Sequence, residues 1–158
     1  MIETTNITYI LRHRKENLKK CSLRGLEEKE NFCFLTYPKV TFIDYPNLIV
    51  LSPHAEVLSK EDQGSLLLID GTWKLAKLME KELVIKNSPI FRSIPSSFQT
   101  AYPRRQGEWI DPKIGLASVE ALYLAFLIMG KSVDSLLENY YWKESFLEKN
   151  QEALANYR

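Results

Sequence analysis

Hydrophobic residues in the first half of the chain fall into short runs that end at turn residues. These runs are "ITYIL" (7–11), "NFCFLTYP" (31–38), "NLIVLSP" (47–53) and "GSLLLID" (64–70). Pro38 and Pro53 end the second and third runs. Continuous apolar runs bounded by turn residues are typical of strands covered on both faces. The pattern therefore favours an α/β fold with a mostly parallel sheet.

Helical periodicity begins after the fourth run. Trp73, Ala76, Met79 and Leu83 recur at helical spacing and predict an amphipathic helix that ends before residues 87–89. Residues 118–129 are apolar on nearly every side and predict a buried helix.

Three polar or small residues mark the ends of that buried helix. Ser118 is expected to cap its start, Glu120 lies in the first turn where the helix dipole favours an acid, and Gly130 is expected to close its end. Two further helices are predicted at 132–141 and 143–157. The aromatic cluster of residues 140–142 between them is interpreted as packing the helices onto the sheet.

Residues 89–115 differ from the rest of the chain in composition and periodicity. Four of the seven prolines lie there, with little periodicity, so we expect loops and one short extended piece at "PIFRSI" (89–94). We divide the chain into an α/β region (1–88) and a second region of loops and helices (89–158), packed as one compact unit.

Length and composition narrow the class of protein. A chain of 158 residues with 45% hydrophobic content and a net charge of +1 is sufficient for one core. Its longest apolar run, Ala121–Met129, is much shorter than a membrane span, and no signal peptide is recognisable, so we expect cytoplasmic residence and no membrane partner. Cys21 and Cys33 are interpreted as reduced thiols, and we expect no metal site.

Positive charge is unevenly distributed along the chain, although the net charge is only +1. One group comprises Arg12, Arg14, Lys15, Lys19, Lys20 and Arg24 against the single acid Glu16, and a second comprises Arg92, Arg104 and Arg105. Such local groups bind phosphate even when the total charge is near zero. The alternative is a solvated loop whose cations only keep the chain soluble.

Asp70 and Trp73 follow the most apolar run. Ligands of open α/β sheets collect beyond the carboxyl ends of the strands, where a carboxylate accepts a proton or binds an ammonium group. An indole face attracts a cation by about 0.5 to 2 kcal/mol. In the alternative interpretation, Asp70 or Thr72 only caps the following helix and Trp73 is its first core residue.

Six segments of the chain carry a resemblance to a known family. They are "LRHRKENLKKCSLRGL", "LSPHAEVLSKED", "IDGTW", "IPSSFQTAYPRR", "GLASVEAL" and "NYYWKESFLEKNQEALANY". Their order and spacing resemble those of the small-subunit rRNA aminocarboxypropyltransferases. "DGTW" and "TAYPRR" also resemble the related DTW-domain tRNA uridine aminocarboxypropyltransferases, and residues 100–105 are nearer to the tRNA enzymes.

The resemblance implies a SPOUT-type α/β fold with a C-terminal trefoil knot, a helical C-terminal lobe and bound S-adenosylmethionine. The group transferred would be the 3-amino-3-carboxypropyl arm, because Trp73 and Ala76 would shield the methyl group. Adenine and ribose would lie against Ile94, Leu116 and Ala117. The full set of implied cofactor contacts is Ser22, Ile69, Asp70, Trp73, Ala76, Ile94, Leu116, Ala117 and Ser118. For Ser22 the alternative is a serine in a surface turn.

The acceptor would be the imide nitrogen of a uridine or pseudouridine, with rRNA favoured as the substrate and tRNA as the alternative. Asp70 is then the candidate base, or it orients the amino group of the cofactor. The implied RNA contacts are Arg12, Arg14, Lys15, Lys19, Lys20, Tyr102, Arg104 and Arg105. We expect a monomer that binds RNA, with a pre-ribosomal particle as one possible setting. Two other functions stay open: a SPOUT-type RNA methyltransferase, and an RNA-binding assembly factor without catalysis.

Overall fold

The computed structural model describes residues 7–15, 18, 21–103 and 115–157, with the backbone alone at Trp73. The elements follow in the order β1 (Thr8–His13), η2 (Leu26–Glu28), β2 (Phe32–Tyr37), β3 (Phe42–Ile43), β4 (Leu48–Leu51), β5 (Ser65–Asp70), α1 (Trp73–Glu82), β6 (Val84–Ile85), β7 (Ile90–Arg92), α2 (Ser118–Ile128), α3 (Lys143–Lys149) and α4 (Gln151–Ala155). The segment η2 is a short 3₁₀-helix.

Five strands form the main sheet in the order β2-β1-β5-β4-β7. Every pairing between them is parallel. The four apolar runs became strands β1, β2, β4 and β5, and the extended piece became β7. The predicted α/β class with a parallel sheet is therefore confirmed.

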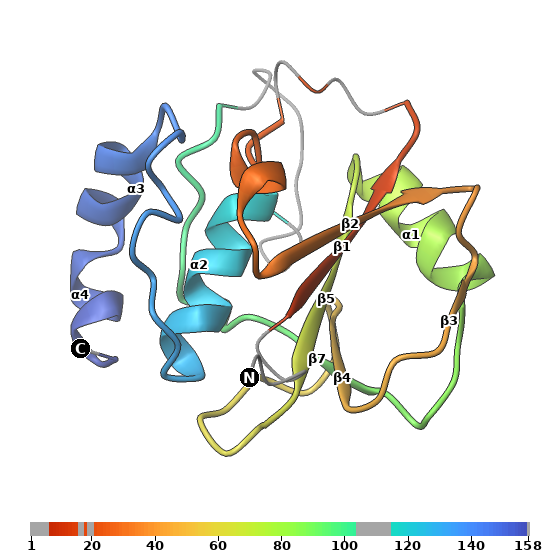
Figure 1. Ribbon diagram of the computed structural model, residues 1–158. Helices are drawn as coiled ribbons and strands as arrows, with labels where there is room; N and C mark the ends of the chain where they lie inside the picture. Colours follow the sequence, from red (N-terminus) through yellow and green to blue (C-terminus); the bar gives the residue numbers. More distant parts are fainter. Residues whose placement is uncertain (1–6, 16–17, 19–20, 104–114, 158) are drawn as a thin grey trace.

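The sheet is covered on both faces. Figure 1 shows α1 against one face and α2 against the other, with α3 and α4 beyond α2. Successive residues of β5 alternate between the two cores: Leu66 and Leu68 pack with α2, and Leu67 and Ile69 pack on the α1 side. A strand covered in this way needs an apolar residue at each position, which explains why "SLLLI" does not alternate with polar residues.

The ends of α2 follow only part of the prediction. Ala117 occupies the N-cap position, and Ser118 is the first helical residue, so the predicted Ser118 cap is wrong. Glu120 accepts a hydrogen bond from the Ala117 N–H at 2.8 Å, which satisfies one of the donors left free at a helix start. Gly130 does close the helix: its φ is 74°, and the next residue bonds back to Phe126 at 2.8 Å.

The C-terminal region differs from the two helices predicted there. Residues 132–141 form turns rather than a helix, although Leu136, Leu137 and Tyr140 are buried. The second predicted helix is divided into α3 and α4 at Asn150. The buried Asn150 side chain accepts from the N–H of Gln99 at 2.7 Å and donates to its carbonyl at 2.8 Å. The helical C-terminal region is thereby tied to the loop near residue 100.

Two short strands were not predicted, and neither was the 3₁₀-helix η2. β3 and β6 pair as a separate two-stranded sheet beside α1. The amphipathic helix correspondingly ends at Glu82, earlier than the periodicity suggested, and the chain becomes extended at once. Within the described residues, no helix has both the length and the apolar character that a bilayer crossing requires.

Candidate functional site

Asp70 is the last residue of β5, at the carboxyl edge of the sheet. It lies on the same face as Leu66 and Leu68, since side chains along a strand alternate, and this is the face that α2 covers. The side chain is buried, with 3% of its surface exposed. A carboxylate in such a place requires nearby donors, because an unpaired buried charge is costly.

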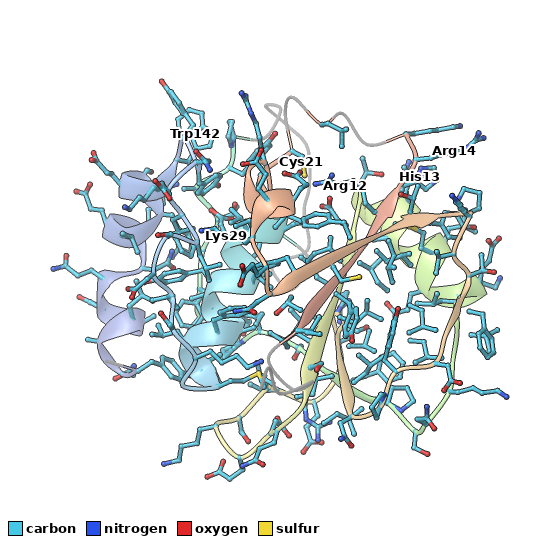
Figure 2. The ribbon with its side chains drawn as sticks, viewed as in Figure 1. Arg12, His13, Arg14, Cys21, Lys29 and Trp142 are labelled. Carbon is cyan, nitrogen blue, oxygen red and sulfur yellow. The ribbon has the colours of Figure 1, made fainter. Side chains whose placement is uncertain are left out.

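Three side chains supply those donors. The Ser118 hydroxyl donates to Asp70 Oδ1 at 2.6 Å. The Cys21 thiol lies 3.3 Å from Oδ2, and Arg12 Nε lies 3.5 Å from the same oxygen. The start of α2, the loop after β1 and β1 itself therefore meet at one carboxylate. Figure 2 shows Arg12 and Cys21 together at this end of the sheet.

Arg12 is buried, whereas a residue that contacts phosphate is expected to be exposed. It is only 9% exposed, and it pairs with Asp70 on the neighbouring strand, where the two residues are in register. Its Nη2 also donates to Glu27 at 3.0 Å, and its guanidinium lies 4.6 Å from the centre of the Phe34 ring. Burial opposes the charge, but Cys21, Glu27 and Asp70 outweigh it and raise the pKa of Arg12. Arg12 is a buried ion-pair partner, and we do not retain it as an RNA contact.

Ser22 joins the same end of the sheet. Its Oγ accepts a hydrogen bond from the Val119 N–H at 3.1 Å, in the first turn of α2. Ser22 and Ser118 therefore flank the start of this helix together with Asp70. Among the predicted cofactor residues, Ser118 is hydrogen-bonded to Asp70, and Ser22 is hydrogen-bonded to the first turn of α2.

The other predicted cofactor residues are divided between the two faces. Ile94 and Leu116 are partly buried against the core on the α2 side, and Ala117 is the N-cap of α2. Ile69 and Ala76 pack in the core on the α1 side. Trp73 is the first residue of α1, and its side chain lies outside the described part of the structure.

The start of α1 decides between two proposed caps. Thr72 is the N-cap, and its hydroxyl accepts a hydrogen bond from the Leu75 N–H at 3.4 Å. Asp70 is two residues earlier and bonds to groups from other elements. The interpretation of Asp70 as a simple helix cap is therefore not supported, whereas Thr72 does cap the helix.

The predicted RNA residues can be placed only in part. Arg14 and Lys15 are exposed in the turn after β1, and the N–H of Lys15 donates to His13 Nδ1 at 3.0 Å. Figure 2 shows Arg14 beside His13 at the carboxyl end of that strand. Tyr102 is partly buried against the α2-side core. Lys19, Lys20, Arg104 and Arg105 lie outside the described residues.

Glu120 is a second buried carboxylate whose importance the sequence did not indicate. Its Oε1 accepts from Thr100 Oγ1 at 2.6 Å and from the Ala117 N–H at 2.8 Å. Its Oε2 accepts from the Ala101 N–H at 2.8 Å and from Tyr140 Oη at 2.9 Å. One acid thus joins three segments that are distant in sequence. The available signal was a single acid within an otherwise apolar helix.

Cys21 is the other residue that sequence reasoning missed, since it was interpreted only as a reduced thiol. Burial raises the pKa of Cys21 to about 12, and Asp70 adds to the effect. The group therefore remains a neutral thiol at physiological pH. Within the described ranges of the chain, no group of three or more His, Cys, Asp or Glu side chains is arranged to hold a metal ion.

Comparison with known proteins gives a family match and matches to solved structures. The family described as "Ribosome biogenesis protein, C-terminal" matches residues 49–158. The fold is similar to the structure of the SAM-dependent rRNA:acp-transferase Tsr3 from Vulcanisaeta distributa, with a TM-score of 0.73 and 24% identity over 97% of this chain and 83% of that chain. No curated protein matches the chain in sequence.

Proposed function

Because this chain belongs to the ribosome biogenesis protein, C-terminal family, we propose that it is an S-adenosylmethionine-dependent transferase acting on rRNA. The group transferred is the 3-amino-3-carboxypropyl arm, and the acceptor is a uridine or pseudouridine base. The six ordered sequence segments and the fold likeness to an enzyme of this description support the proposal. The proposal includes a SPOUT-type fold with a C-terminal trefoil knot and a relation to the DTW-domain enzymes.

The arrangement that carries the proposal is a buried acid beside two serines at the sheet's carboxyl edge. Asp70 suits an ammonium group or an imide N–H, because Oδ1 accepts one hydrogen bond among the described residues and has a further lone pair. The Ser22 hydroxyl accepts from α2 and retains its own proton for donation. Leu116 and Ile94 add apolar surface nearby. This donor set fits S-adenosylmethionine, so Ser22, Asp70 and the start of α2 are the groups that would hold it.

When bound, S-adenosylmethionine supplies three electrophilic carbons around one positively charged sulfur. The protein decides which carbon meets the acceptor by covering the others. We assign Trp73 and Ala76 to cover the methyl group. Ile69, Ile94, Leu116, Ala117 and Ser118 complete the proposed contact set.

The role of Asp70 follows from the acceptor chemistry. An imide nitrogen becomes a strong nucleophile only when it loses its proton, which Asp70 would take as the new N–C bond forms. The electron pair of the broken C–S bond remains on sulfur. If Asp70 instead orients the amino group of the arm, the proton passes to solvent. Both roles use the same carboxylate oxygen.

We assign RNA binding to the exposed cations Arg14 and Lys15, which follow β1 directly. Lys19, Lys20, Tyr102, Arg104 and Arg105 complete the proposed set of RNA contacts. Phosphate contacts of this kind make binding depend on salt. Replacing Arg14 and Lys15 by Gln should weaken RNA binding and reduce its salt dependence without altering the affinity for S-adenosylmethionine.

Labelled cofactor tests the reaction itself. The protein is incubated with rRNA and with S-adenosylmethionine labelled either in the methyl group or in the amino acid arm. Label should reach RNA only from the arm. Transfer of methyl label would establish a methyltransferase instead, and RNA binding without cofactor binding would establish a non-catalytic assembly factor.

A variant of Asp70 tests the site. Asp70→Asn should lower arm transfer by about 100-fold or more, the scale of a lost general base. Asp134→Asn, at an exposed position in the C-terminal turns, is the matched control and should leave transfer unchanged. Equal activity in the two variants would remove Asp70 from the reaction.

A further inference from the structure

Cys21 lies between the two charged members of the site. Its Sγ is 3.3 Å from Asp70 Oδ2 and 3.5 Å from Arg12 Nη2. A thiol offers one weak donor and one weak acceptor. The donor here meets the carboxylate and the acceptor meets the guanidinium. Together with the contact from Arg12 Nε to Asp70, these bonds close a triangle.

Arg12 is itself held firmly on its other side. Glu27 accepts from its Nη2 at 3.0 Å, and the same carboxylate accepts from the Gly25 N–H at 2.9 Å through its other oxygen. Phe34 lies beneath the guanidinium at 4.6 Å. An acid, an aromatic ring and a thiol therefore restrict the guanidinium, which in turn restricts Asp70.

The thiol is a lasting donor in this triangle. Cys21 is 6% exposed, and burial raises its pKa to about 12. Its proton therefore stays in place throughout the neutral range and remains directed at Asp70. Cys33, on the neighbouring strand β2, is only partly buried and packs on the α1 side of the sheet.

The hydrogen bonds to Asp70 are unequally divided between its two carboxylate oxygens. Oδ2 accepts from both Arg12 and Cys21, while Oδ1 accepts from Ser118. A carboxylate has about four lone-pair sites. With Oδ2 occupied twice, the remaining capacity is on Oδ1, beside the start of α2.

We propose that Cys21 and Arg12 are positioning residues that occupy Oδ2 of Asp70 and so direct Oδ1 toward the ligand. This inference rests on the proposed function, since it concerns the same site. Neither residue touches the reacting atoms in this scheme. Their effect passes through the orientation of one carboxylate.

Substitutions at Cys21 test the inference through cofactor affinity, measured by calorimetry without RNA. Cys21→Ala removes the donor and should weaken S-adenosylmethionine binding by about tenfold, the lower end for a hydrogen bond to a charged group because a thiol is a weak donor. Cys21→Ser restores a donor and should return the affinity to within about twofold of the parent. Cys33→Ala is the matched control and should leave it unchanged.

Transfer kinetics and thermal unfolding separate positioning from packing. We expect Cys21→Ala to lower kcat by about tenfold, with an unchanged KM for RNA, and Cys21→Ser to recover it. Equal affinity and kcat in the parent, Ala and Ser proteins would overturn the inference. So would equal losses in Ala and Ser that follow a shared fall in Tm, because such losses report packing alone.

The parent protein separates this inference from the proposed function. If the parent transfers no label from the amino acid arm, the proposed function fails. If the parent is active and Cys21→Ala is equally active and binds equally well, only the positioning role fails.

Discussion

Asp70 and Glu120 are both buried carboxylates that contact the first turn of α2, but they are satisfied in different ways. Glu120 accepts four hydrogen bonds, two at each oxygen, and none of the four donors is charged. Two of these donors are backbone N–H groups. All of its lone-pair sites are therefore used within the protein.

Within the described residues, Asp70 accepts three hydrogen bonds, one of them from a guanidinium. All three donors are side chains. It stands at the edge of the sheet where parallel folds bind ligands. A carboxylate with an opposite charge beside it and an acceptor site to spare is suited to a ligand, whereas a fully bonded one is suited to holding loops in place.

Isosteric amides provide the strongest test of this difference. Glu120→Gln should lower the free energy of unfolding by about 3 kcal/mol, because its new NH₂ group faces a backbone N–H that cannot turn away. Asp70→Asn should cost about 1 to 2 kcal/mol, since the Ser118 hydroxyl can turn to accept from the NH₂ and Arg12 keeps its ion pair with Glu27. Urea denaturation measures both.

The same two variants provide each other's control in transfer assays. Asp70→Asn should lose activity while keeping most of its stability. A larger loss of stability in Asp70→Asn than in Glu120→Gln would reverse the assignment of the ligand-facing and structural acids.

Unfolding at alkaline pH tests the burial of the Cys21 thiol beside Asp70. The pKa of Cys21 is about 12 in the folded protein against an ordinary value of 9.0. The unfolded chain therefore loses this proton first, so stability that is present below pH 9 declines as the pH rises toward 12. The decline should be on the order of 2 kcal/mol at pH 11.

Cys21→Ala should remove that part of the alkaline decline, measured as the difference in unfolding free energy between pH 8 and pH 11. Cys33→Ala should retain it. Identical pH profiles in the parent and Cys21→Ala would show that the thiol titrates alike in the folded and unfolded states.

The strands were predictable because each needs a continuous apolar run. Strands β4 and β5 are buried at every position, which is the pattern of a central parallel strand. β3 and β6 have two residues each, too few for any periodicity to appear. Their pairing depends on a tertiary contact beside α1 that local sequence does not indicate.

The wrong helix at 132–141 has a physical explanation. Leu136, Leu137 and Tyr140 are buried at spacings that a helix would also give, so periodicity alone cannot distinguish the two. Ser135 has a φ of 66°, which interrupts a right-handed helix. The aromatic cluster is likewise divided: Tyr140 is buried, while Tyr141 is 85% exposed.

The site was predictable at Asp70 and not at its partners. The end of an apolar strand can be recognised in the sequence, and ligands of parallel α/β sheets bind beyond the carboxyl ends of the strands. The ion pair between Arg12 and Asp70 joins residues 58 positions apart, which local sequence does not indicate. Because Arg12 begins a segment rich in basic residues, it was instead predicted to be an exposed RNA contact. The hydrogen bonds of Glu120 reach segments 19 or 20 positions earlier and later, beyond any helical spacing.

Tyr140→Phe measures one of the four bonds to Glu120. Loss of the hydroxyl at 2.9 Å from Oε2 leaves three donors and should cost about 1 to 2 kcal/mol of unfolding free energy, since the acceptor is an acid. Tyr141→Phe, at the exposed neighbouring position, should change stability by less than about 0.5 kcal/mol. Equal effects would mean that the Tyr140 hydroxyl adds nothing to the loop contacts.

Glu27 gives the smallest effect and tests the outer support of Arg12. Burial opposes its charge, but hydrogen bonds from its own N–H, from Arg12 and from Gly25 lower its pKa below the ordinary 4.5. The stability from Glu27 is therefore present above pH 4.5 and is lost as the pH falls further. Because the Glu27 side chain is 38% exposed, Glu27→Gln should cost less than about 1 kcal/mol at pH 7. Its acid unfolding curve should be flatter than that of the parent, whereas Glu28→Gln, on the next exposed residue, should match the parent; parallel curves for all three proteins would show that Glu27 does not support Arg12.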